Sequence, residues 1–319
     1  HRLDPPEGGQ HHREGKGQIL FGLRDTVLAH LFEYDSSHGK FPGTILDTEK
    51  GIEFNGVEVL TFAEKDPKNL PWKSLDIDIV IESSGFFTSR EKAELHIQAG
   101  AKRVLITAAP KSDDISTYVM GVNHTLIKKE DTIISNASCT TNCLAPMIKV
   151  LEEHYGINSG MFITVHAYTN DQRLQDGPHD DLRRARAAAV NIIPTSTSAA
   201  NALFKVYPHL KGKISGVADR VPVINGSLTE FICILNKKPT TQEINRVFES
   251  ASQESLKGIL EYSIKPLVSS DIIGNSHSCV YDAALTQVTG DLVKVTGWYD
   301  NEYGYSNRLI DLMGYWLNS

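Results

Sequence analysis

The sequence lacks a long apolar run and an excess of basic residues. Its 319 residues are 40% apolar and 22% charged, which is typical of a soluble globular protein with room for two domains. No uninterrupted apolar run approaches the roughly 20 residues that a membrane-spanning helix needs. The formal net charge of −7 does not indicate a nucleic-acid-binding protein. We therefore expect neither a membrane nor a nucleic acid as a partner.

Cysteine is also scarce, with four residues at positions 139, 143, 233 and 279. They form no C-x-x-C pair, so we expect no metal site. A chain of this length with so few cysteines is not a disulfide scaffold, and no signal peptide is visible. These absences favour a reducing, cytoplasmic setting.

A third absence concerns the first 26 residues, where no strand is followed by a G-x-G-x-x-G turn, the usual sign of a dinucleotide site. Residues 1–12 are polar and without period, which is typical of disorder. Gly15 and Gly17 precede an apolar run instead of following one. Asp25 is the only acidic candidate here for holding a ribose.

From Val27 onward, strands and helices alternate. Residues 76–82 and 103–107 are typical of buried strands, and the alternation predicts a parallel sheet with helices on both faces. Residues 83–85 follow the first of these strands, and Thr107 ends the second. Ligands of such sheets bind at the carboxyl ends of strands, so these residues are candidates for a dinucleotide cleft, with ordinary loop chemistry as the alternative.

The centre of the chain is the stretch SNASCTTNC, residues 135–143. An apolar run precedes it, and Leu144, Ile148 and Leu151 follow at helical spacing, so Cys139 lies where a strand ends and a helix begins. The partial positive charge and free N–H groups of a helix start favour thiolate, the reactive form of cysteine. A small buried cysteine without chemistry is the alternative.

The limits of this helix follow from its residue types. Ser138 or Thr140 is suited to cap the start, and Pro146 is expected in the first turn. Gly156 is suited to end the helix.

His166 is the candidate partner of Cys139. Residues 160–166 are typical of a strand that ends in this histidine, and a strand–helix–strand crossover would return the chain beside its starting point. A Cys–His pair provides a nucleophile and a general base. A purely structural histidine is the alternative.

Phosphate binding is predicted at two further places. Residues 195–198 (TSTS) precede an Ala-rich helix at 199–206, and hydroxyls with free N–H groups at a helix start form an anion site, which is compatible with plain capping. Arg220 is a single charge in an apolar strand and needs an anion or an acidic partner. We favour phosphate, because neighbours such as Asp219 point to the other face of a strand.

Together, the segments SNASCTTNCLAP, HAYTNDQRLQDGPHDDLRRARAA, IIPTSTSAA, RVP and WYDNEYGYSNR resemble the family of phosphorylating glyceraldehyde-3-phosphate dehydrogenases, from about residue 28 onward. The resemblance implies that Cys139 is the nucleophile and His166 the base. It also implies substrate and phosphate contacts, which fall on Ser138, Thr140, Thr169, Thr197, Ser198 and Arg220. It implies NAD as cofactor, with NADP left open, and the cofactor contacts fall on Thr107, Asn301, Tyr305 and Lys65.

The resemblance also implies the fold and the assembly. We expect an α/β protein with a Rossmann-like parallel-sheet domain at 1–138, atypical over 1–26 and completed by a C-terminal helix at 306–319. An α+β catalytic and oligomerisation domain with a mixed or antiparallel sheet is expected at 139–305. The polar loop at 168–191, with its arginine cluster, is placed between the subunits of a homotetramer.

The expected reaction is oxidation of glyceraldehyde 3-phosphate to 1,3-bisphosphoglycerate through a Cys139 thioester, with inorganic phosphate as the second substrate. Two alternatives stay open: an erythrose-4-phosphate dehydrogenase, and a non-catalytic family member whose cofactor binding is impaired. The family usually has glycine where Ser198 stands. Cys143 is a possible resolving thiol, although inert packing is the simpler interpretation.

Overall fold

The computed structural model describes residues 18–20 and 25–319. Most of the atypical segment 1–26, with Gly15, Gly17 and the expectation of disorder, therefore lies outside the described residues. Of Asp25, the candidate for the ribose, only the backbone at the start of the first helix is described.

A small four-stranded sheet opens the chain. Its strands lie in the order β1 (Gln18–Leu20), β6 (Val57–Phe62), β5 (Gly51–Phe54) and β4 (Ile45–Asp47), with β1 and β6 parallel. Helix α1 (Asp25–Glu33) packs on it through Leu28. The turn between β5 and β6 has positive φ at Asn55 and Gly56 (47° and 85°), as a two-residue hairpin turn requires. A short hairpin of β2 (Tyr34–Asp35) and β3 (Gly39–Lys40) follows α1.

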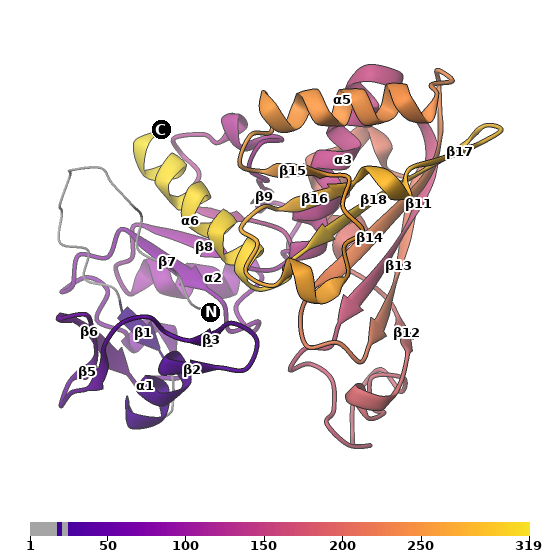
Figure 1. Ribbon diagram of the computed structural model, residues 1–319. Coiled ribbons are helices and arrows are strands. Elements are labelled where there is room, and N and C mark those ends of the chain that lie inside the picture. The colour runs from indigo at the N-terminus through magenta and orange to yellow at the C-terminus, as the bar shows by residue number, and fades with distance from the viewer. Residues whose placement is uncertain (1–17, 21–24) are drawn as a thin grey trace.

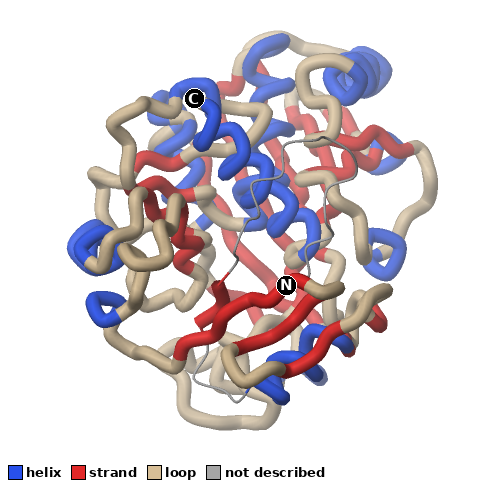
Figure 2. The backbone as a smooth tube through the Cα atoms, turned by 90° about the vertical axis from the view of Figure 1, so that its left-hand side faces the viewer, coloured by secondary structure: helices blue, strands red, loops and turns tan. Residues whose placement is uncertain are grey.

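The second sheet is parallel throughout, in the order β7 (Ile79–Glu82), β8 (Arg103–Ile106), β10 (Ile133–Ser135) and β9 (Ser116–Thr117). Alternate side chains face opposite sides of a strand. Val104 accordingly packs with Ala93 of α2 (Arg90–Gln98) on one face, and Leu105 packs with Leu312 and Trp316 of α6 (Tyr303–Asn318) on the other. Figure 1 shows α6 crossing the N-terminal half of the molecule, and the C label in Figure 2 marks the end of this helix. The expected sheet with helices on both faces is confirmed.

The third sheet has eight strands and mixed pairing, which confirms the expected second architecture. Its two parallel pairs are β11 with β13 and β15 with β16; the other pairs are antiparallel. The bounds are β11 (Ile157–Ala167), β12 (Ile193–Thr195), β13 (Ile214–Val221), β14 (Ser227–Leu235), β15 (Leu260–Ser263), β16 (Cys279–Asp282), β17 (Gln287–Thr289) and β18 (Leu292–Tyr299).

The main core lies between this sheet and three helices, α3 (Cys139–Tyr155), α4 (Ala199–Val206) and α5 (Thr241–Gln253). Figure 1 shows α3 and α5 together over the strands. Short 3₁₀ turns connect the larger elements at Pro67–Asn69, His124–Leu126, Ala188–Val190, Pro208–Leu210, Ser269–Ile272 and Ala283–Leu285.

Helix α3 links the parallel sheet to the mixed sheet. Ser138 is its N-cap, with Oγ accepting a hydrogen bond from the Thr141 N–H at 3.2 Å, and Gly156 ends it with φ of 68°. The expected position of Pro146 is wrong. The helix begins at Cys139, so Pro146 lies in its interior and removes one main-chain hydrogen bond there.

Cys143 packs closely against Gly297 of β18. A Cβ at this position would lie 2.6 Å from Cys279 Sγ, 2.9 Å from Met147 Sδ and 3.0 Å from Cys143 Sγ. Strand and helix are therefore in direct backbone-to-sulfur contact. Cys143 is fully buried in this layer, and its thiol donates to the Gly297 carbonyl at 3.5 Å, which favours inert packing.

Candidate active site at the junction of the two sheets

Cys139 and His166 meet where the parallel sheet adjoins the mixed sheet. Cys139 Sγ lies 3.4 Å from His166 Nε2. The predicted approach is present, but the crossover argument behind it was wrong in one respect. Strand β10 before Cys139 and strand β11, which carries His166, belong to different sheets, so α3 carries the chain from one sheet to the other.

The hydrogen bonds of His166 indicate which ring nitrogen is the base. Nδ1 lies 2.7 Å from the Ala167 carbonyl oxygen, which can only accept a hydrogen bond. Arg220 Nη1 is 3.0 Å from the same Nδ1, but it also donates to Ala167 O at 2.9 Å and to Thr169 Oγ1 at 3.3 Å. With Nδ1–H donating to Ala167 O, every one of these groups has a partner. Nε2 is then unprotonated and faces the Cys139 thiol.

Burial and Arg220 together set the charge state of the pair. Burial, followed by the positive charge of Arg220, lowers the pKa of His166 to about 3. Burial raises the pKa of the Cys139 thiol, and Arg220 and the Thr140 N–H oppose part of that rise. In the absence of a bound anion, the structure therefore holds a neutral imidazole beside a neutral thiol.

Arg220 has no acidic partner among the described residues. Its Nη1 bonds only neutral groups and the His166 ring, and its buried Nε has no partner. Burial lowers the pKa of the guanidinium. A half-buried cation without a carboxylate is suited to an anionic ligand, which was the preferred interpretation of this residue.

Tyr299 is a site residue that the sequence reasoning missed. Its hydroxyl lies 2.9 Å from Thr140 Oγ1 and 2.7 Å from Thr164 Oγ1, and its ring lies edge-on to His166 at 5.9 Å between centroids. Tyr299 thereby joins the first turn of α3 to β11. A tyrosine in an apolar strand next to a conspicuous polar motif was the available signal, because a buried hydroxyl needs a partner.

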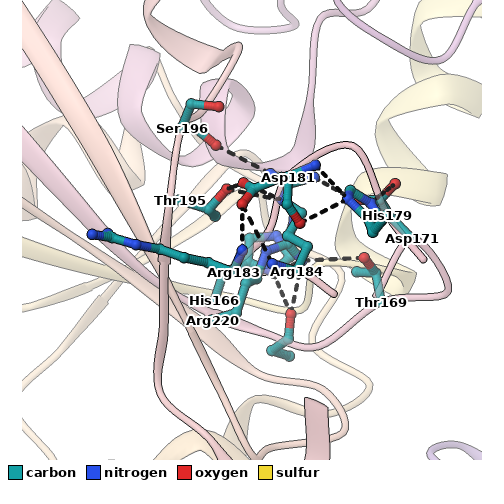
Figure 3. A network of polar contacts seen from close by, with 11 residues as sticks. His166, Thr169, Asp171, His179, Asp181, Arg183, Arg184, Thr195, Ser196 and Arg220 are labelled. Atoms are coloured by element: carbon teal, nitrogen blue, oxygen red, sulfur yellow. Dashed lines mark hydrogen bonds and ion pairs between the residues drawn. The ribbon is translucent and has the colours of Figure 1, made fainter. Parts of the chain in front are cut away.

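Arg184 occupies the centre of the polar loop at 168–191 (Figure 3). It forms an ion pair with Asp171, donates through Nε to Thr195 Oγ1 at 2.9 Å, and donates through Nη2 to Ser196 O at 3.1 Å. Thr195 Oγ1 in turn donates to Asp181 at 2.7 Å. The arginine cluster is thus more than a solvated face, because Arg184 fastens the loop to the segment that leads into α4.

The start of α4 carries two of the predicted phosphate residues. Thr197 Oγ1 accepts from the Ala199 N–H at 3.2 Å. Ser198 is the N-cap, but its side chain makes no capping hydrogen bond. The structure describes no direct contact of Thr197 or Ser198 with Cys139.

The predicted cofactor residues fall into two groups. Asn301 Oδ1 accepts from Ser227 Oγ at 2.7 Å, and Ser227 Oγ accepts from the Ala167 N–H at 3.0 Å, so Asn301 is tied to the residue next to His166. Tyr305 OH donates to the Ala137 carbonyl at 3.1 Å, two residues before Cys139. Ser227 is a second residue that the sequence reasoning missed.

Among the described contacts, none joins Thr107 or Lys65 to Cys139 or His166. Thr107 donates through N and Oγ1 to the Glu82 carbonyl, at 3.0 and 3.2 Å, and thus joins the carboxyl ends of β8 and β7. Gly85, just beyond β7, has φ of 77° and open space where a Cβ would be. This edge suits a dinucleotide. Lys65 is exposed on the loop after β6, and no described contact joins it to the others.

Two negative findings apply to the described part of the chain. No group of His, Cys, Asp or Glu side chains there is arranged to hold a metal ion. None of the helices described is long and apolar enough to span a bilayer.

Comparison with known families identifies this arrangement. Residues 138–301 match the family model for the C-terminal domain of glyceraldehyde 3-phosphate dehydrogenase, and residues 22–90 match the model for its NAD binding domain. The chain belongs to the glyceraldehyde-3-phosphate dehydrogenase family. The sequence resemblance is therefore confirmed, and so is the architecture of an NAD-binding domain joined to a catalytic domain.

Curated members of the glyceraldehyde-3-phosphate dehydrogenase family align over most of the chain. The enzyme of Thermotoga maritima is 57% identical over 293 residues, 91% of this chain and 88% of the relative. Glyceraldehyde-3-phosphate dehydrogenase 2 of Bacillus subtilis is 52% identical over 289 residues, 90% and 85%. The Geobacillus stearothermophilus enzyme is 52% identical over 291 residues, 91% and 87%.

Proposed function

We propose that this chain oxidises glyceraldehyde 3-phosphate to 1,3-bisphosphoglycerate with NAD and inorganic phosphate. The observation that carries the proposal is the contact between Cys139 Sγ and the unprotonated Nε2 of His166, beside an arginine with no carboxylate partner among the described residues. Membership of the family and the match to its NAD binding domain support the same conclusion.

The proposed chemistry begins at the thiol. His166 Nε2 takes the proton of Cys139, and the thiolate attacks the aldehyde carbon. The proton passes to the new alkoxide, and His166 takes it back as the C–H bond breaks and a Cys139 thioester remains. NAD, when bound, supplies the hydride acceptor for this chemistry. Inorganic phosphate then attacks the acyl carbon of the thioester and displaces the Cys139 thiolate, which leaves 1,3-bisphosphoglycerate as the product.

The helix start assists at the carbonyl oxygen. The backbone N–H of Cys139 is at the start of α3, where N–H groups have no partner inside the helix. We assign to it the stabilisation of the oxyanion that forms when the thiolate attacks. Ser138 and Thr140 act by holding this turn in place, because their hydroxyls are bonded to Thr141 and Tyr299.

Arg220 links phosphate binding to the strength of the base. Its charge lowers the pKa of His166, so an anion bound to the guanidinium raises that pKa again and strengthens the base. We assign the phosphates of the reaction to Arg220 and Thr169 and to the start of α4 at Thr197 and Ser198. These groups offer a charge, hydroxyls and helix N–H donors to an anion.

We place the cofactor between the two sheets. Thr107 marks the carboxyl edge of the parallel sheet, and Asn301 and Tyr305 mark the catalytic side, while Lys65 is the outlying candidate near the adenosine. The choice between NAD and NADP depends on a ribose contact for which Asp25 is the only candidate. Because residues 1–26 lack the expected glycine turn, we expect NAD binding weaker than in relatives. Calorimetric titration beside a chimera with a relative's N-terminal segment checks this.

The substrate is tested by comparing kcat/KM for glyceraldehyde 3-phosphate and erythrose 4-phosphate, each with NAD and inorganic phosphate. A clear preference for the three-carbon aldehyde supports the proposal, and a preference for the four-carbon aldehyde replaces it with the erythrose alternative. No oxidation of either aldehyde, with NAD bound at saturation, leaves the non-catalytic alternative.

We further propose a cytoplasmic homotetramer with a cofactor domain at 1–138, completed by the C-terminal helix, and a catalytic and oligomerisation domain at 139–305. Two apolar surfaces support the assembly. The loop at 168–192 projects beyond the mixed sheet (Figure 1) and exposes Leu174 and Leu182 by more than four fifths. The sheet face opposite α3 exposes Met161, Val217, Ile234 and Leu292.

Sedimentation equilibrium tests the assembly, with a mass of four chains as the expected result. Met161→Glu and Leu182→Glu, one on each surface, are each expected to give smaller species, because buried unpaired charges are costly at an interface. The four free thiols support a reducing compartment. A monomer at micromolar concentration would contradict the proposed assembly.

A further inference from the structure

His38 connects the small N-terminal hairpin to the catalytic half of the chain. It lies in the turn between β2 and β3, and its Nε2 lies 3.1 Å from Asp300 Oδ2, just after β18. The His38 side chain is 14% exposed and that of Asp300 is fully buried. This protected contact joins the hairpin to the turn after β18, far from Cys139 in sequence.

The hairpin holds the His38 ring in a defined orientation. Asp35 Oδ1 accepts from the backbone N–H groups of Ser37 and His38, both at 2.8 Å, and faces His38 Nδ1 at 3.3 Å. Each ring nitrogen therefore faces a carboxylate oxygen. Hydrogen bonds of this kind to charged acceptors are the stronger class in proteins.

Asp300 organises the turn that presents Asn301. Its Oδ1 accepts from the N–H groups of Glu302 and Tyr303, at 2.9 and 2.8 Å, and from Asn225 Nδ2 at 2.8 Å. Its Oδ2 accepts from the Gly274 N–H at 2.8 Å. Among the described residues, His38 is the one side chain able to carry positive charge that contacts this buried carboxylate. Removing it leaves this buried carboxylate with backbone and amide N–H donors alone.

The turn leads directly to the reacting groups. Asn301 follows Asp300 and bonds Ser227, which bonds the Ala167 N–H beside His166. We propose that His38 is a positioning residue: by clamping Asp300 it holds Asn301 at the nicotinamide side of the site, so that the N-terminal hairpin and the catalytic turn keep one relative position. This inference rests on the proposed function, because it assigns Asn301 to the cofactor.

The direct test measures amide hydrogen exchange in the full chain without cofactor. In His38→Ala, exchange at Glu302 and Tyr303 is expected to rise about tenfold, as the loss of one charge-assisted contact predicts. His38→Gln keeps a donor toward Asp300 and is expected to restore most of the protection. His30→Ala, an exposed histidine on α1, is the matched control and leaves exchange unchanged. Unchanged exchange in His38→Ala overturns the proposal.

A second measurement separates positioning from general stability. The Kd for NAD is expected to rise about tenfold in His38→Ala, while the rate at which iodoacetamide alkylates Cys139 stays the same. In an Asp300→Asn background, His38→Ala is expected to add little, because the two residues act as one unit. Equal losses in NAD affinity and in alkylation would show a general structural role and contradict the proposal. If the wild-type chain fails to bind NAD, the proposed function is wrong, and the exchange at Glu302 and Tyr303 still decides whether the clamp exists.

Discussion

Two helix starts in this protein follow the same local plan and differ in what their polar groups contact. Both α3 and α4 begin after a strand, with a serine at the N-cap. At α3 the Ser138 hydroxyl accepts from the Thr141 N–H, and Thr140 is bonded to Tyr299. At α4 the Ser198 side chain makes no capping bond. The hydroxyl at the start of α3 is used in a hydrogen bond within the protein, whereas the Ser198 hydroxyl at the start of α4 makes no capping hydrogen bond.

The difference follows from the tasks that we assign. A nucleophile has to be held rigidly relative to its base, and every hydrogen bond inside the protein adds to that restraint. An anion site requires donors that the protein has not already used. The start of α3 therefore holds a reactive side chain, and the start of α4 is suited to receive a ligand. The following predictions test this contrast, beginning with the largest expected effect.

Replacing Cys139, the proposed nucleophile at the start of α3, is expected to have the largest effect. Cys139→Ser is expected to lower kcat for aldehyde oxidation by at least about 10⁴-fold, because a hydroxyl cannot replace the thiolate. NAD affinity, measured by titration, is expected to stay the same. Cys143→Ser, one helical turn later and buried, is the control and retains the ability to oxidise the aldehyde. Full activity of Cys139→Ser would remove Cys139 from the mechanism.

The reactivity of the thiols provides the second test. Iodoacetamide is expected to label Cys139 well before Cys143, Cys233 and Cys279, which are buried. Burial raises the Cys139 pKa, so the labelling rate should increase about tenfold per pH unit through the neutral range. His166 has a pKa of about 3, so it is neutral at every pH above that and no step near 6.5 is expected. Peptide mass mapping measures this, and equal labelling of all four thiols contradicts it.

Removing the charge of Arg220, which contacts His166, is the third test. Arg220→Leu is expected to raise KM for the phosphorylated aldehyde by about 10- to 100-fold, the loss of a charge-assisted contact of about 1.5–3 kcal/mol. Unphosphorylated glyceraldehyde should be affected much less in KM. Steady-state kinetics with both aldehydes provide the measurement. An equal loss for both would mean that Arg220 acts only on the structure.

The smallest effects compare the two serines directly. Ser138→Ala is expected to lower the free energy of unfolding by about 1 kcal/mol through loss of a cap, whereas Ser198→Ala should leave it nearly unchanged. Ser198→Ala is expected instead to weaken phosphate binding a few-fold, seen in KM for inorganic phosphate. Denaturant titration and kinetics on both variants decide the matter. Equal losses of unfolding free energy in Ser138→Ala and Ser198→Ala would contradict the proposed difference between the two helix starts.

The sequence predicted the architecture well wherever local patterns determine it. Helical spacing of Leu144, Ile148 and Leu151 and the stop at Gly156 predicted the correct course of α3. The expected position of Pro146 was wrong because α3 begins at Cys139, so the proline lies beyond the first turn, where its ring removes a main-chain hydrogen bond.

The sequence predicted which residues form the candidate site better than it predicted the contacts between them. The contact of Cys139 with His166 was expected, but the strands that carry them belong to different sheets. Tyr299 and Ser227 were missed because their importance comes from partners distant in sequence, which no spacing rule reveals. The role of Arg184 was likewise invisible, since an arginine in a polar loop looks the same in sequence whether it is solvated or fastened to Ser196.

Ala137, just before the N-cap of α3, has φ of 59°, a conformation that a residue with a side chain adopts only at a cost. Its N–H donates to Ser135 Oγ, and its carbonyl accepts from Tyr305 of α6. A chain emerging from the ribosome folds from its N-terminal end first, and Asn301 and Tyr305 are the last of the site residues to be synthesised. Cys139 is therefore synthesised long before Tyr305 is available to hydrogen-bond the Ala137 carbonyl. On the proposed function, catalytic competence is therefore a property of chains synthesised past Tyr305, and a chain that stalls earlier carries the proposed nucleophile without this contact behind it.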